Sequence, residues 1–149
     1  GCSLALFCDF IYATPRSKFA DPHVSVGLVA GDGGCVMWPQ LIGYARAKKY
    51  LLTGEVMLAQ DALEMGLITE VYEEDQIDAE VQQLAEKLRD GAKYAIRWTK
   101  TSINAGLKVM ANSIIDRAAA FENVTQLMED HKIALQAFSD KEKPRFKQK

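Results

Sequence analysis

The feature that most constrains this chain is a cluster of three glycines around one carboxylate, Gly31-Asp32-Gly33-Gly34, which ends the stretch 19–34. An apolar run with helical character begins directly after it, at Cys35. Backbone amides at a glycine-rich helix entrance attract anions or developing negative charge. The sequence therefore predicts a tight loop that leads into a helix, with Asp32 displayed beside a position suited to negative charge.

Around this loop, short strands are expected in the first half of the chain and helices in the second. Apolar spacing is clearest over 75–89, where Ile77, Val81, Leu84 and Leu88 recur at helical intervals. Gly106 is expected to stop one helix, and Pro39 is expected to delay another until about Met37. The expected strands cover 9–13, 19–20 and 67–71, and the expected helices cover 4–8, 37–42, 44–52, 59–65, 75–89, 92–105, 109–128 and 131–138. The stretch 23–26 alternates only weakly.

Composition limits the class of protein. The 149 residues are enough for one domain with a core, and the net charge of −2 argues against a general nucleic-acid binder. Three cysteines without a CxxC spacing indicate reduced thiols in a cytoplasmic setting and do not favour metal ligation. No apolar run approaches the length of a membrane span. The chain starts in core-like sequence, so we expect it to be the remainder of a longer protein.

Four polar residues are candidates for chemistry, and each has a structural alternative. Asp32 could transfer protons or could simply cap the following helix, since Asp is a preferred N-cap. His23 could be a base or a satisfied polar residue. Ser3 has no nucleophile motif and is expected to cap the helix 4–8. His131 lies among charged residues and is expected on a solvated helix face.

Several segments together resemble the crotonase (enoyl-CoA hydratase/isomerase) superfamily. The first 13 residues, GCSLALFCDFIYA, are similar to its glycine turn, helix and "CD-I-A" segment. The stretch 19–34 is similar to its F-x-x-P-E-x-x-x-G-x-x-P-G-x-G-G segment. The next helices and strand are matched by AKKYLLTG at 47–54 and AQDALEMGLITEV at 59–71, and the ending is matched by KEKPRF at 141–146.

The resemblance implies an α/β fold whose ββα spiral core is represented only by its last part, over 1–72. A helical C-terminal region with a basic tail, over 73–149, would then build a trimer or a dimer of trimers. It also implies an acyl-CoA thioester substrate, no separate cofactor, and an oxyanion hole of two backbone amides. One amide would come from an N-terminal segment that precedes this chain, and the other from the glycine turn that ends at Gly1.

The family's site residues are only partly matched. Its two catalytic glutamates correspond to Ser3 and His23, and its proline and small residue in the loop correspond to Ala30 and Asp32. Some family isomerases carry an acid one position before Asp32, so a displaced carboxylate, with His23 as partner, could replace the lost pair. The residues that contact coenzyme A correspond to Phe138 and Lys141. The bland alternative is that the basic tail, Lys141, Lys143, Arg145, Lys147 and Lys149, is only solubilising.

Three functions follow from this reading. The first is an enoyl-CoA hydratase or isomerase that uses Asp32, His23 and Ser3, without a metal, a membrane or a nucleic acid. The second is a non-catalytic homologue that binds acyl-CoA. The third, RNA binding, has precedent in the superfamily but is disfavoured by the net charge.

Overall fold

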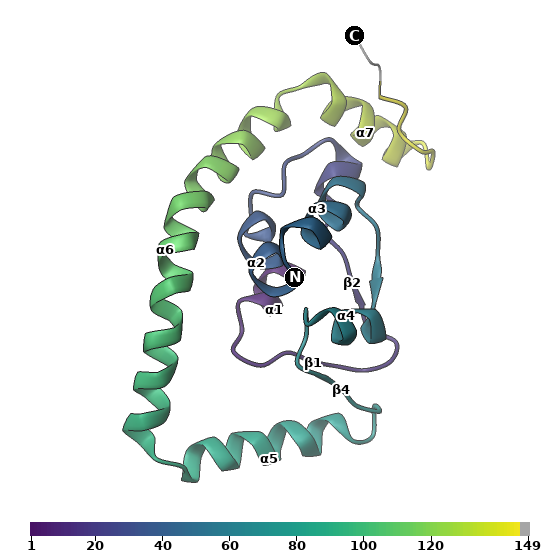
Figure 1. Cartoon of the computed structure of the whole chain (residues 1–149). Helices are drawn as coiled ribbons and strands as arrows, with labels where there is room; N and C mark the ends of the chain where they lie inside the picture. The colour runs from purple at the N-terminus through teal and green to yellow at the C-terminus, as the bar shows by residue number, and fades with distance from the viewer. Residues whose placement is uncertain (147–149) are drawn as a thin grey trace.

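The computed structural model describes residues 1–146 (Figure 1). Two lysines of the predicted basic tail, Lys147 and Lys149, lie outside this range. The first 71 residues form short elements: α1 Cys2–Leu6, β1 Tyr12–Ala13, β2 Lys18–Phe19, a 3₁₀ helix η1 His23–Val26, α2 Gly34–Ile42, α3 Tyr44–Thr53, β3 Met57–Leu58, α4 Ala59–Met65 and β4 Glu70–Val71.

Three longer helices follow: α5 Ile77–Asp90, α6 Lys93–Gln126 and α7 Glu129–Ser139. Figure 1 shows that they run around the outside of the short elements like a frame, with α5 and α7 at opposite ends of α6. None of the helices within residues 1–146 combines the length and the apolar run that crossing a bilayer requires. The predicted α/β class and the helical C-terminal region are confirmed, while the boundary at residue 72 stays a prediction.

The strands are shorter than the sequence predicted. β1 pairs with β4 in parallel, with Tyr12 opposite Glu70 and Ala13 opposite Val71. β2 pairs with β3 antiparallel, with Phe19 opposite Met57. The expected strands over 9–13 and 67–71 were therefore too long, because only two residues of each find a pairing partner in the described chain.

The core lies among the short elements. Trp38, Leu6, Met57, Leu67 and Val36 are its largest fully buried side chains. The rings of Trp38 and Tyr50 pack with their centroids 5.7 Å apart, which joins α2 to α3. From the frame, α6 adds four partly buried apolar side chains that pack against this core: Leu107, Ala111, Ile114 and Ile115.

Two helix boundaries differ from the prediction. Gly106 lies inside α6 and does not end a helix. A glycine in a helix interior costs about 1 kcal/mol, and the apolar contacts that follow it along α6 outweigh that cost. Similarly, α2 begins at Gly34 and contains Pro39 in its interior, because the burial of its apolar residues holds the helix together despite the missing amide donor.

One other local prediction was wrong, and the structure defines one stretch for which the sequence favoured no element. The weakly alternating stretch 23–26 is η1, which starts after Pro22 and ends at Gly27, whose φ is +70°. His131 does not lie on a solvated face: it is partly buried, and its Nδ1 lies 2.7 Å from the carbonyl oxygen of Val26. This bond ties α7 to η1, so the last helix is fixed against the segment that carries His23.

Candidate functional site

Asp32 lies in the turn before α2 and is exposed. The turn requires glycine at Gly33, whose φ of +124° is rarely adopted by other residues. Gly33 is the N-cap of α2, and no side chain caps this helix. The alternative that Asp32 serves as a helix cap is therefore wrong. Its Oδ1 instead accepts a hydrogen bond of 3.0 Å from the hydroxyl of Ser3.

Ser3 does not cap α1 either. The N-cap of α1 is Gly1, and the buried Ser3 side chain points across to the loop and bonds Asp32. The backbone amides at the entrance of α2 are also engaged: Cys35 donates to Ala30, and the amides of Val36 and Met37 donate to Gly33. Backbone carbonyls therefore satisfy these three amides, and none of the three is free to bind an anion.

His23 stands at the start of η1 between two carboxylates. Its Nδ1 lies 2.5 Å from Oδ1 of Asp21, whose side chain is only 3% exposed. Its Nε2 lies 3.9 Å from Oε1 of Glu122, which α6 contributes. His23 is therefore neither isolated nor a solvated surface residue. It faces one carboxylate from the segment just before η1 and one carboxylate from α6.

The sequence prediction missed Asp21 and Glu122. In the structure, two of the loop glycines lie directly against these carboxylates. A Cβ on Gly34 would overlap Oδ2 of Asp21, and a Cβ on Gly31 would overlap the carboxylate of Glu122. Gly31 and Gly34 thus make room for carboxylates. Asp21 could also have been noticed because it precedes His23 by two residues, whereas Glu122 has no such local link.

Two thiols line the same region. Burial raises the pKa of the Cys2 thiol, and the negative charges of Asp21 and Asp32 add to the effect. Burial likewise raises the pKa of Cys35, again with help from these two carboxylates. Both groups therefore stay thiols near neutral pH and are poor nucleophiles.

The cluster has the spacing of a possible cation site. Asp21, His23 and Asp32 each offer one ligand atom, and these atoms lie within 4.8 Å of one another. In the arrangement described, however, Nδ1 of His23 is paired with Asp21. The expectation that this chain uses no metal stays a prediction.

The residues expected to contact coenzyme A lie at the end of α7. Phe138 is 81% exposed, and the backbone amide of Lys141 donates to its carbonyl oxygen. Lys141 has a φ of +57°, a left-handed conformation that a non-glycine residue seldom adopts. Gly1 is exposed and accepts the first helical bond of α1 from Ala5. Within residues 1–146, none of these three residues shares a side-chain hydrogen bond with the Asp32 cluster.

The arrangement can carry out proton transfer. The structure brings together the three residues predicted to be catalytic, Ser3, His23 and Asp32, and joins Asp32 to Ser3 by a hydrogen bond. A carboxylate and an imidazole whose polar atoms lie within 4.8 Å of each other can remove a proton from one atom and return one to another.

Comparison with known proteins identifies the family of the chain. A family model described as enoyl-CoA hydratase/isomerase matches residues 1–149. A short-chain-enoyl-CoA hydratase from Clostridioides difficile is 37% identical over 116 residues, which cover 78% of this chain and 75% of the relative. A crotonyl-CoA hydratase from Syntrophomonas wolfei is 33% identical, over 98% of this chain and 56% of the relative.

Solved structures give the same result. An enoyl-CoA hydratase/isomerase from Pseudoalteromonas atlantica aligns with a TM-score of 0.91 and 28% identity, over 99% of this chain and 59% of that one. The chain thus spans little more than half of several of the proteins that it matches. With its crotonase fold and a family match along its whole length, this chain belongs to the enoyl-CoA hydratase/isomerase family.

Proposed function

We propose that this protein is an enzyme that acts on an enoyl-CoA thioester, as a hydratase or an isomerase. The observation that carries the proposal is the meeting of Asp32 and His23, whose side-chain atoms lie within 4.8 Å of each other. The family's glutamate pair is missing from the matching positions, and these two groups supply a carboxylate and an imidazole instead. Relatives named as enoyl-CoA hydratases support the substrate class.

For hydration, the proton transfers balance when the pair passes on one proton. His23 takes a proton from water while the water oxygen bonds to the β-carbon, and the double-bond electrons move into the thioester as an enolate. The imidazolium gives this proton to the Asp32 carboxylate, and Asp32 gives it to the α-carbon, so both groups return to their starting states. Ser3 keeps the carboxylate in position through its hydrogen bond. For isomerisation, the same pair would move a proton between two carbons.

Binding of coenzyme A is proposed to use Phe138 and Lys141. A lysine suits this role because its ammonium is a compact charge for phosphate, and the exposed Phe138 ring offers a stacking face for adenine. The enolate oxygen would be held by two backbone amides, one from the glycine turn that ends at Gly1. Self-association as a trimer or a dimer of trimers, through the C-terminal helices, belongs to the same proposal.

The second candidate is a homologue that binds acyl-CoA without turning it over. It is favoured by one observation, that neither Ser3 nor His23 is a glutamate. Both candidates bind a CoA thioester, so binding alone does not separate them, and only the first converts it.

The deciding experiment assays the protein, expressed from its complete gene, with a panel of enoyl-CoA thioesters of increasing chain length. Asp32→Asn and His23→Ala should each lower kcat by about 100-fold or more, because each removes a proton-transfer group. Asp61→Asn, which changes an exposed acid on α4, serves as the matched control and should retain full activity. Full activity in both site variants would exclude these roles, and thioester binding with no turnover would favour the second candidate.

A further inference from the structure

Asp21 is an unusual residue to bury. Its side chain is 3% exposed, and its Oδ2 is one of two buried side-chain atoms within residues 1–146 that have no hydrogen-bond partner. An unpaired buried carboxylate is costly, so a partner must compensate for it. Its other oxygen, Oδ1, meets Nδ1 of His23 at 2.5 Å and the backbone amide of His23 at 3.3 Å.

This contact determines which ring nitrogen of His23 carries a proton. A carboxylate only accepts hydrogen bonds, so Nδ1 must be the donor. The neutral imidazole then has its lone pair on Nε2, and in the described part of the chain no group forms a hydrogen bond with that atom. Nε2 is thereby left free to take a proton from another molecule.

Glu122 faces the same nitrogen from a distance. Its Oε1 lies 3.9 Å from Nε2, which is too long for a hydrogen bond but close enough for charge attraction. The loop and α6 lie in close contact here, since a Cβ on Gly31 would lie 2.7 Å from the carbonyl oxygen of Ala118. One turn further along α6, Thr125 accepts a bond of 3.3 Å from the amide of Val29.

We propose that Asp21 is a positioning residue that holds His23 as a base at Nε2, and that Glu122 is the carboxylate that stabilises the imidazolium once Nε2 has taken a proton. This inference rests on the proposed function in one respect, namely that His23 takes up a proton during the reaction. Asp21 keeps its own charge throughout: the proton that reaches Nε2 comes from water or a substrate carbon, and Nδ1 never gives up the proton that it shares with Asp21.

The charged groups around His23 come from every side of the site. Asp21 precedes it on the same segment, Asp32 lies in the loop before α2, and Glu122 projects from α6. All three are acids, so they favour the protonated ring together, but only Asp21 contacts Nδ1. Asp21 alone can therefore set the tautomer.

The kinetic test compares Asp21→Asn and Glu122→Gln with the control Asp61→Asn. Asp21→Asn keeps the size of the side chain but removes its charge, and its amide can donate to Nδ1, which would move the ring proton to Nε2. We expect kcat to fall about 100-fold with KM nearly unchanged, because the loss affects the transition state only. Glu122→Gln should lower kcat about tenfold. Wild-type kcat in Asp21→Asn would overturn the proposal while leaving the proposed function intact.

The spectroscopic test does not depend on turnover. Each imidazole of a ¹⁵N-labelled sample gives two nitrogen signals, and those of His23 are the ones that disappear in His23→Gln. His131 is an internal reference because its Nδ1 bonds a carbonyl. At a pH where both rings are neutral, we expect His23 to carry its proton on Nδ1, and in Asp21→Ala to share it with Nε2. A wild-type ring protonated on Nε2 would overturn the proposal, even if the variant does not fold. Absence of turnover in the wild type would instead count against the proposed function alone.

Discussion

The short elements of residues 1–71 and the three long helices that frame them are built differently. In α2, five of nine residues are buried, including Val36 and Trp38. In α6, which has 34 residues, only Ala118 is buried, and α5 buries none. The first region is held by apolar burial, whereas the frame depends on helix propagation and a limited set of contacts.

Those few contacts gather near the candidate site. Within residues 1–146, apart from the apolar side chains of α6 and an exposed ion pair between Lys100 and Asp9, polar groups of the frame reach the first region at Glu122, Thr125 and His131. Each of these three meets the stretch 19–34. The frame therefore adds little to the core but supplies one acid of the site and holds η1 in place. The first region therefore supplies both the core and most of the site, and the frame completes the site with Glu122.

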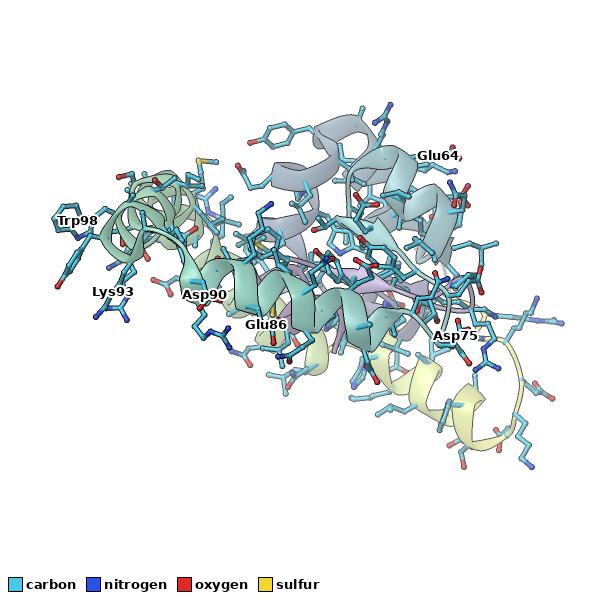
Figure 2. The ribbon with its side chains drawn as sticks, turned by 90° about the horizontal axis from the view of Figure 1, so that it is seen from below. Glu64, Asp75, Glu86, Asp90, Lys93 and Trp98 are labelled. Atoms are coloured by element: carbon cyan, nitrogen blue, oxygen red, sulfur yellow. The ribbon has the colours of Figure 1, made fainter. Side chains whose placement is uncertain are left out.

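The largest difference should appear when one tryptophan from each region is removed. Trp38 is fully buried, while Trp98 is 67% exposed and points outward at the edge of the molecule (Figure 2). Trp38→Ala should lower the free energy of unfolding by about 3–5 kcal/mol, because it leaves a cavity. Trp98→Ala should change it by less than about 0.5 kcal/mol. Denaturant unfolding measures both, and equal losses would show that the frame is packed as tightly as the core.

A smaller effect should separate two glycines. Gly31→Ala forces a methyl group against Glu122 and the backbone of Ala118, which should cost about 1–3 kcal/mol. Gly106→Ala meets nothing within 4 Å in the exposed middle of α6 and should stabilise the protein by about 0.5–1 kcal/mol. The same unfolding measurements decide the outcome. If Gly31→Ala were neutral, the loop and α6 would not be in the close contact on which the placement of Glu122 depends.

The sequence predicted those parts of the site that local patterns carry. Asp32 stands out among glycines, and the resemblance drew attention to Ser3 and His23, so all three were found. The contacts between them were not predicted. The hydrogen bond between Ser3 and Asp32 joins residues 29 positions apart, and no local sequence pattern indicates such a contact. Glu122 is 90 positions from Asp32 along a helix whose residues give no reason to single it out.

The fold shows the same division between local and distant effects. α4 was predicted at its observed bounds, since an apolar face and a terminal glycine, Gly66, both lie within it or beside it. The break expected at Gly106 did not occur, because packing on the core decides the length of α6. The strands were predicted too long for a similar reason: β-forming residues are a local property, but a strand ends where its partner does.

The smallest expected effect concerns the two thiols beside the acidic cluster, Cys2 and Cys35. Burial first, and then the charges of Asp21 and Asp32, raise the pKa of Cys2 and Cys35, so at a given pH a smaller fraction of each is thiolate. Because the thiolate is the species that reacts, iodoacetamide at pH 8 should alkylate the exposed Cys8 several-fold faster than Cys2 or Cys35. The difference in rate should narrow as the pH rises.

Asp21→Asn removes one of the charges and should speed alkylation of Cys2 and Cys35, while the rate at Cys8, the internal control, should stay unchanged. Peptide mass spectrometry resolves the three rates. An equal rate at all three cysteines would contradict the combined effect of burial and the two carboxylates on the pKa of Cys2 and Cys35.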